Sequence, residues 1–265
     1  MSAPRRKHER FDASDAGTFC PHRECDGSGY VLAEDTDAAV PCRCREERVR
    51  RRRVRALTSS IPRRYRDVGL ERFPIKDFPQ TVLRPLRKYL RELDENLASG
   101  HGLWLGGDLG TGKTSAAALV AKEASARGHT VAFHTAPELL ARIRDTFNEN
   151  SKHTYGELFE QLRSLDLLVI DDMGTQQTKP WVLEQLYVIV NDRYLDERAI
   201  VMTTNLPEAE LAAQVTPPVT SRLLEICGKP ISFSGPDYRR LAVLGETKGG
   251  SASPLALELA DPGPT

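Results

Sequence analysis

The chain has 265 residues, enough for one ordinary domain and a small appendage. Apolar residues make up 40% and charged residues 28%, as is usual for soluble globular proteins, and the formal net charge of zero excludes no class of partner. The basic first residues lack the apolar segment of a secretory signal, and no apolar run approaches the roughly 20 residues of a membrane span. We therefore expect a cytoplasmic protein with no membrane partner, in a compartment that keeps thiols reduced.

Four of the five cysteines lie within residues 20–44, as a Cys-x4-Cys pair, a spacer and a Cys-x-Cys pair. Between the pairs, GYVL and AAVP predict two strands joined by the polar turn AEDTD. Such a hairpin would bring the second pair back to the first, and four converging thiolates suit a tetrahedral zinc ion. A segment with so small an apolar core also needs a bound metal or another cross-link to be stable.

We therefore predict a zinc-binding module over residues 20–45, preceded by a disordered N-terminus at 1–19. The predicted zinc ligands are Cys20, Cys25, Cys42 and Cys44. Disulfides and unligated thiols are the alternatives, although a reducing compartment disfavours disulfides. His22 lies between the first two cysteines and could replace one of them as a ligand.

The segment that follows holds eight arginines within residues 43–55. It predicts a basic linker helix over residues 46–60. One interpretation is a solvated helix in which glutamates pair with arginines four residues further on. The other is contact with the phosphates of single-stranded DNA. The residues leave both interpretations open, because aromatic side chains for base stacking are missing nearby.

Strand-like and helix-like segments alternate along the middle of the chain. Strands are expected at 102–107, 130–135, 166–171 and 199–204, helices at 114–127, 137–147 and 181–195, and a loop at 148–156. Strands separated by helices predict a parallel sheet with helices on both faces. We therefore expect an α/β domain over residues 61–245, followed by a disordered tail rich in Gly, Ser and Pro at 246–265.

The sequence GDLGTGKT at residues 107–114 matches the phosphate-binding pattern G-x-x-x-x-G-K-[ST], after a predicted strand and before a predicted helix. Its glycines allow a tight turn whose N–H groups point at phosphate oxygens. Lys113 would reach the β- and γ-phosphates of ATP, and the Thr114 hydroxyl would bind Mg²⁺. The predicted nucleotide-binding residues of this loop are Gly107, Gly110, Thr111, Gly112, Lys113 and Thr114.

Polar residues follow the next two predicted strands. Asp171 and Asp172 end the apolar run LLVI, and Asn205 follows the strand AIVMTT. Because the carboxyl ends of parallel strands line the ligand crevice, we expect these side chains beside the phosphates. Asp171 would hold Mg²⁺ directly or through water, Asp172 would orient or deprotonate the attacking water, and Asn205 would position that water.

Several blocks together resemble one known family. They are IPRRYRDVGLERF (61–73), GLWLGGDLGTGKT, DLLVIDDMG, WVLEQLYVIVNDRY, TTNLP, SRLLEICG and GPDYR, in this order. They are similar to the DnaC/DnaI/IstB group of bacterial AAA+ ATPases over about residues 61–241. The resemblance implies the AAA+ αβα fold and an ATPase that self-associates.

The resemblance also implies roles for four residues. Asn205 would be the sensor-1 residue, and Arg222 would be an arginine finger that reaches the γ-phosphate of a neighbouring subunit. Arg239 would be a sensor-2 arginine on its own subunit's nucleotide, with the adjacent Arg240 as a competitor for that role. Many AAA+ proteins carry Glu where this chain has Asp172, so we expect slow hydrolysis.

The layout is closest to that of DnaI-like loaders, which carry a zinc-binding segment ahead of the AAA+ domain. The resemblance therefore implies a loader that docks on the hexameric replicative helicase, hydrolyses ATP and associates with single-stranded DNA. An IstB-like helper in DNA transposition is the first alternative, although such helpers lack the zinc segment. A zinc-dependent adaptor that uses ATP only as a conformational ligand is the second.

Overall fold

The computed structural model describes residues 20, 24–25, 28–32, 38–45, 61–148, 151, 154–175 and 179–244. The chain divides into two compact units, Met1–Arg53 and Val54–Thr265. The expected disordered ends and the expected basic helix at 46–60 lie outside the described residues. Within the described residues, every helix is too short or too polar to cross a lipid bilayer.

The N-terminal unit contains the hairpin expected from its sequence. Strands β1 (Tyr30–Leu32) and β2 (Ala39–Pro41) pair antiparallel, with Tyr30 opposite Pro41. The guanidinium of Arg45 lies 4.3 Å from the centre of the Tyr30 ring. Among the described residues of this unit, the buried apolar side chains are those of three cysteines, with Val31 packed against them. Such a core is too small to hold the unit together by apolar burial alone.

The C-terminal unit is built on a sheet of five parallel strands in the order β4-β5-β6-β3-β7. The strands are β3 (Leu103–Gly107), β4 (Val131–Thr135), β5 (Leu167–Asp171), β6 (Ala199–Thr204) and β7 (Ile231–Phe233). The four strands expected between residues 102 and 204 are confirmed within a residue or two. Because all strands run the same way, their carboxyl ends meet at one edge of the sheet, where ligands bind in such folds.

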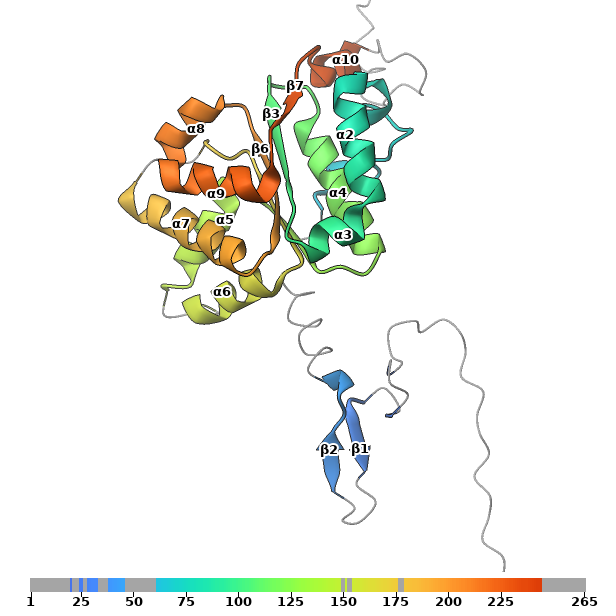
Figure 1. Ribbon diagram of the computed structural model, residues 1–265, viewed down its shortest axis with the longest axis vertical. Coiled ribbons are helices and arrows are strands. Elements are labelled where there is room, and N and C mark those ends of the chain that lie inside the picture. Colours follow the sequence, from blue (N-terminus) through green and yellow to red (C-terminus); the bar gives the residue numbers. More distant parts are fainter. Residues whose placement is uncertain are drawn as a thin grey trace, which may run out of the picture. The chain divides into compact units, whose positions relative to one another are not determined.

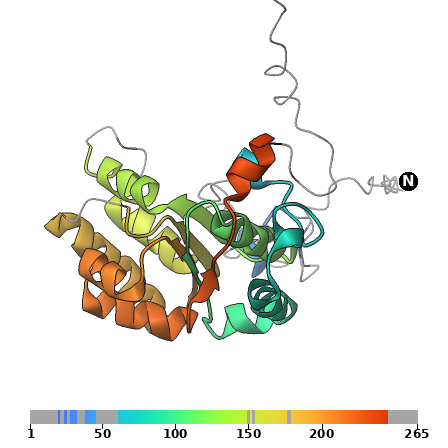
Figure 2. The ribbon, with the colours of Figure 1, turned by 90° about the horizontal axis from the view of Figure 1, so that it is seen from above.

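Helices cover both faces of this sheet, as Figure 1 shows and as the view from above in Figure 2 confirms. One layer contains α2 (Gln80–Arg91), α3 (Leu93–Ala98) and α4 (Lys113–Ala126), and the other contains α5 (Ala136–Asp145), α6 (Tyr155–Ser164), α7 (Pro180–Leu195), α8 (Glu208–Val215) and α9 (Pro217–Cys227). Two 3₁₀ turns, η1 (Arg63–Tyr65) and η2 (Ile75–Asp77), precede α2, and α10 (Tyr238–Leu244) follows β7.

The prediction of a loop at 148–156 is wrong at its C-terminal end, since α6 already begins at Tyr155. Thr154 and Glu157 form a capping box there, in which each side chain bonds the backbone N–H of the other residue. This reciprocal bonding satisfies two of the free N–H groups of the first turn and starts the helix earlier than the polar composition indicates.

Successive strand residues alternate between two apolar cores. Leu103 and Leu105 of β3 face the core that contains α2 and α4, whereas Trp104 faces the core that contains α7 and α9. Both faces of the sheet are therefore buried, which explains why these strands read as unbroken apolar runs. Most alanines of α4, including Ala117 and Ala121, are fully buried, and their small side chains let this helix pack closely on the sheet.

Arg193 of α7 is buried at the opposite edge of the sheet, with 1% of its surface exposed. Its guanidinium donates to the carbonyl oxygens of Leu162 at 2.7 Å, Leu165 at 3.1 Å and Ala199 at 2.7 Å. These carbonyls belong to the end of α6, the turn before β5 and the start of β6. One planar cation thus satisfies three backbone acceptors that are shielded from water.

We expect Arg193→Lys to lower the free energy of unfolding by about 3 kcal/mol, because a single ammonium cannot reach all three carbonyls and buried acceptors lose their donors. Urea unfolding of the full chain measures this change. Arg163→Lys is the matched control, since the Arg163–Asp196 ion pair lies at the surface and should contribute less than about 1 kcal/mol. Equal losses of unfolding free energy for the two variants would contradict the role of Arg193 in holding the three backbone carbonyls together.

Candidate functional site

The phosphate-binding pattern forms the turn between β3 and α4. Gly107, Gly110 and Gly112 have φ angles of 128°, 74° and 92°, a region that side chains with a Cβ rarely adopt. A Cβ on Gly112 would lie 2.6 Å from the ring of Phe78, so the turn also packs too tightly for a larger residue. The free N–H groups at the start of α4 therefore lie beside this turn and favour an anion there.

Lys113 is the first residue of α4 and is only 6% exposed. Its ammonium donates to the carbonyl oxygen of Gly107 at 2.8 Å and to that of Asp108. Burial lowers the pKa of Lys113, while the nearby charge of Asp172 opposes that shift. Thr111 is also buried, and its hydroxyl donates to the Asp108 carbonyl at 2.7 Å. The cation is thus held inside the loop, where phosphate oxygens would meet it.

Thr114 and Asp171 come together at the carboxyl end of β5. The Thr114 hydroxyl donates to Asp171 Oδ1 at 3.0 Å. Burial raises the pKa of Asp171, whereas hydrogen bonds from Thr203 and Thr114 lower it. A hydroxyl and a carboxylate at this separation are the hard oxygen ligands that Mg²⁺ takes beside nucleotide phosphates. The residues present therefore fit the magnesium ion that the sequence predicts.

Thr203 of β6 connects the two acids and was missed by the sequence analysis. Its buried hydroxyl donates to Asp171 Oδ1 at 2.6 Å and accepts from the backbone N–H of Asp172 at 2.9 Å. Asp172 has a φ of 56°, which is uncommon for a residue other than glycine. The Thr203 hydroxyl holds that N–H while the Asp172 side chain lines the cavity. The sequence feature that could have identified Thr203 was its position two residues before Asn205, at the end of a strand that neighbours the strand of the two acids.

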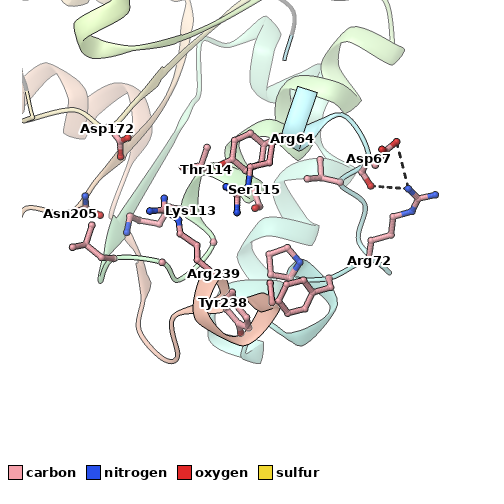
Figure 3. Close-up of a pocket in the computed structure, with 18 residues that line it drawn as sticks. Arg64, Asp67, Arg72, Lys113, Thr114, Ser115, Asp172, Asn205, Tyr238 and Arg239 are labelled. Carbon is pink, nitrogen blue, oxygen red and sulfur yellow. Dashed lines mark hydrogen bonds and ion pairs between the residues drawn. The ribbon is translucent and has the colours of Figure 1, made fainter. Parts of the chain in front are cut away.

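A cavity of about 390 Å³ opens beside the loop. Figure 3 shows Lys113, Asp172 and Asn205 together on one side of it, with Tyr238 and Arg239 of α10 below them. The predicted site residues that line it are Gly110, Gly112, Lys113, Thr114, Asp172, Asn205 and Arg239. Gly107, Thr111 and Asp171, the other predicted residues of the site, are not among the residues that line it. The structure thus brings together residues that are up to about 130 positions apart in the sequence.

The far side of the cavity is formed by residues to which the sequence analysis gave no role. Tyr65, Val68, Phe73 and Pro74 line it together with the charged residues Arg64, Asp67 and Arg72, all from the segment before α2. Lys122 Nζ of α4 donates to the Val68 carbonyl at 2.8 Å and holds this segment against the phosphate-loop helix. Apolar and aromatic side chains among charged ones, beside a phosphate loop, suit a flat nucleotide base with a polar edge. In the sequence, the only sign that this segment is functional was that residues 61–73 form one of the blocks that carry the family resemblance.

The three arginines considered in the sequence lie in different places. Arg239 lines the cavity, whereas Arg240 is a largely exposed side chain 3.9 Å from Asp237 and is absent from the lining. The geometry therefore favours Arg239 over Arg240 as a cation for the subunit's own nucleotide. Arg222 of α9 lies outside the cavity, against Tyr187 and Tyr194.

The four cysteines of the N-terminal unit converge, with their sulfur atoms all within 4.8 Å of one another. The Cys20–Cys42 and Cys25–Cys44 sulfur pairs are 3.7 and 3.5 Å apart. A tetrahedral zinc ion with Zn–S bonds of about 2.3 Å requires sulfur atoms about 3.8 Å apart. Burial, together with hydrogen bonds from the neighbouring thiols, raises the pKa of Cys44 to about 12. The cluster thus fits zinc, and none of the four cysteines forms a disulfide among the described residues. His22 lies outside the described residues.

The chain is similar to curated proteins of two kinds. It is 32% identical over 142 residues to the replicative helicase loader DnaC of Escherichia coli K12, covering 54% of this chain and 56% of that protein. It is 30% identical over 142 residues to the ATP-binding protein of insertion sequence IS1162 of Pseudomonas fluorescens, covering 50% and 60% respectively. The chain thus spans little more than half the length of these relatives.

The solved structure of a DnaC helicase loader superimposes with a TM-score of 0.56 at 22% identity, covering 65% of this chain and 99% of that one. This likeness confirms the expected AAA+ αβα fold. The family model described as "IstB-like ATP binding protein" matches residues 47–226, well over half of the chain. The match includes the phosphate loop, both acids, Asn205 and Arg222. The chain therefore belongs to the family of IstB-like ATP-binding proteins.

Proposed function

We propose that this protein binds ATP and Mg²⁺, hydrolyses the nucleotide slowly, and loads a hexameric replicative DNA helicase in the cytoplasm. The observation that carries the ATPase proposal is one cavity in which the phosphate loop faces Asp172 and Asn205. The loader proposal is supported by the similarity to DnaC and by the cysteine module that precedes the nucleotide-binding unit.

Each residue of the cavity has a stated task in this proposal. The loop and Lys113 bind the phosphates, and Thr114 and Asp171 hold Mg²⁺, which would neutralise developing charge between the phosphates. Asp172 takes the proton of the attacking water, and Asn205 orients that water by hydrogen bonding. Arg239 binds the phosphates from α10. The Asp172 side chain is one methylene shorter than the Glu that many AAA+ proteins carry, which makes hydrolysis slow and suits a switch.

A pair of variants in this cavity separates binding from chemistry. Lys113→Ala removes the buried cation, and we expect a fluorescent ATP analogue to lose its affinity. Asp172→Asn should leave that affinity intact and lower phosphate release on the order of 10²-fold, as expected for loss of a general base. Each variant serves as the control for the other. Normal binding by Lys113→Ala, or normal turnover by Asp172→Asn, would contradict the assigned role.

We also propose that zinc, held by Cys20, Cys25, Cys42 and Cys44, shapes the surface that docks on the helicase. The support is the fit of the four sulfur atoms to tetrahedral geometry and the very small apolar core around them. In a module of this kind, metal binding supplies much of the folding free energy. The ATPase unit has its own two cores and would fold without the metal.

The purified chain should contain about one zinc ion per chain by elemental analysis. Cys42→Ser should lose it, and co-purification with the replicative helicase should fall while ATP binding remains. Cys227→Ser is the matched control, because that thiol lies in the other unit and donates to the Ile200 carbonyl at 3.2 Å. Zinc-free wild type would contradict the metal proposal. Retained helicase binding by Cys42→Ser would contradict the docking role, and capture of a transposase in place of a helicase would favour the transposition helper.

Association with single-stranded DNA is the remaining part of the proposal. The arginine segment first considered for it lies largely outside the described residues. An aromatic cluster in the ATPase unit supplies the stacking surfaces that this segment lacks. Tyr155 stacks on Phe159 at 4.3 Å, and Phe147, which is 59% exposed, lies 6.3 Å from Trp181. Arg144 lies 5.2 Å from the Trp181 ring. One exposed ring, three partly buried rings and a cation beside them supply the stacking and the charge that sequence-tolerant binding of single strands requires.

We expect Phe147→Ala and Trp181→Ala each to weaken binding of a labelled oligo-dT by roughly 10-fold, because base stacking on one ring contributes about 1–3 kcal/mol. Fluorescence anisotropy at low salt measures the affinity. Leu195→Ala, which removes another exposed apolar side chain outside the cluster, is the control. Unchanged affinity in both ring variants would contradict the cluster's role and leave the arginine segment as the DNA-binding site.

A further inference from the structure

Tyr238 is the first residue of α10 and, among the residues of that helix whose exposure is described, the one that is buried. Its hydroxyl donates to the carbonyl oxygen of Asp77 at 2.9 Å, 161 positions earlier in the chain. Its backbone N–H donates to the carbonyl oxygen of Gly110 at 2.9 Å. Tyr238 therefore ties α10 both to the segment before α2 and to the phosphate loop.

The ring of Tyr238 packs against two phenylalanines of that segment. It meets Phe73 edge-on with the ring centres 5.6 Å apart, and its centre lies 5.7 Å from that of Phe78. Phe73 lines the cavity, and the Phe78 ring is the group that a Cβ on Gly112 would strike. Aromatic pairs in these geometries stabilise a contact beyond the burial of apolar area, so the ring fixes the start of α10 relative to the cavity.

Arg239 follows Tyr238 directly and lines the cavity. Among the described residues, the hydrogen bond that Arg239 makes runs from its backbone N–H to Asp237 Oδ1 at 2.9 Å, so its guanidinium is not held by a side-chain partner. Burial is the main cause that lowers the pKa of Lys113, and the nearby charge of Arg239 lowers it further. In the view of Figure 3, Arg239 lies between Lys113 and Tyr238.

The two cations of the cavity repel each other when no anion lies between them. A long side chain such as that of Arg239 then moves toward water unless its backbone is fixed. The seven residues of α10 offer little else to fix it, since Leu241 is partly buried against the core and the helix has few other apolar contacts. Cations that are already in place bind phosphate more tightly, because the ligand does not have to order them.

We propose that Tyr238 is a positioning residue of the nucleotide site. By docking α10 on the segment before α2 and on the phosphate loop, it holds Arg239 against the repulsion of Lys113 where the phosphates bind. The proposal rests on the nucleotide-binding function proposed above and on the role of Arg239 in it. It adds the residue that places Arg239, and it links the wall formed by Phe73 to the phosphate end of the same cavity.

The test is a double-variant cycle in the full chain, with the affinity for a fluorescent ATP analogue as the readout. We expect Arg239→Ala and Tyr238→Leu each to lower this affinity on the order of 10-fold, because both remove the cation from the phosphates. Tyr238→Leu/Arg239→Ala should bind about as well as Arg239→Ala alone, since the tyrosine acts through the arginine. Tyr238→Phe keeps the ring and loses the bond to Asp77, so its affinity should fall only about 3-fold.

Tyr89 of α2 provides the matched control. It is 7% exposed, its hydroxyl donates to the carbonyl oxygen of His101 at 2.8 Å, and it is not among the residues that line the cavity. Tyr89→Leu should lower the free energy of unfolding in urea, as Tyr238→Leu should, and keep the wild-type affinity for the analogue. A general loss of stability would weaken nucleotide binding in both leucine variants, whereas the positioning role weakens it in Tyr238→Leu alone.

Two results would overturn the inference. One is wild-type affinity in a folded Tyr238→Leu chain, and the other is the same loss from Tyr238→Leu with and without Arg239, which would mean that the tyrosine binds the nucleotide itself. If Tyr238→Leu does not fold, Tyr238→Phe enters the same cycle. Wild-type affinity in Arg239→Ala would overturn the role of Arg239 and this inference with it, and the nucleotide site itself, which Lys113→Ala tests, would stand.

Discussion

β5 and β6 end side by side, and the Thr203 hydroxyl joins their ends by donating to Asp171 and accepting from the N–H of Asp172. The Thr203 hydroxyl thus fixes the position of Asp171, the proposed metal ligand, relative to Asp172, the proposed general base. Thr114 of α4 bonds to the same carboxylate oxygen, so the phosphate-loop helix is tied to the same point. The hydrogen bond from Thr203 to Asp171 is buried, and a buried hydrogen bond to a charged group is stronger than one at the surface.

The parallel sheet makes this junction possible. β3 lies next to β6, and β6 lies next to β5, so the phosphate loop, Asn205 and the two acids emerge at the same edge although the chain visits them in a different order. The apolar alternation of these strands between two cores fixes their register. Packing of α4 through buried alanines then brings the start of that helix to the same edge.

The remaining features extend from this edge in two directions. The segment before α2 closes the cavity on the side away from Asp172 and Asn205. Its position depends on the hydrogen bonds from Lys122 to Val68 and from Tyr238 to Asp77. On α7 and α9, Arg222 lies against the rings of Tyr187 and Tyr194, outside the cavity.

The sequence by itself determined the phosphate loop, the alternation of strands and helices between residues 102 and 204 and the paired cysteines, because these depend on local spacing and periodicity. The hairpin of the cysteine module and four strands of the sheet lie where their patterns predict. Helix α6 was missed, although Thr154 and Glu157 have the Thr-x-x-Glu spacing of a capping box. Only the tertiary structure decided that Thr203 connects the two acids, that Val68 and Phe73 form a wall of the cavity, and that Arg239 rather than Arg240 lines it. It also placed Arg222 on two tyrosines. These are contacts between distant parts of the chain, and no local pattern encodes them.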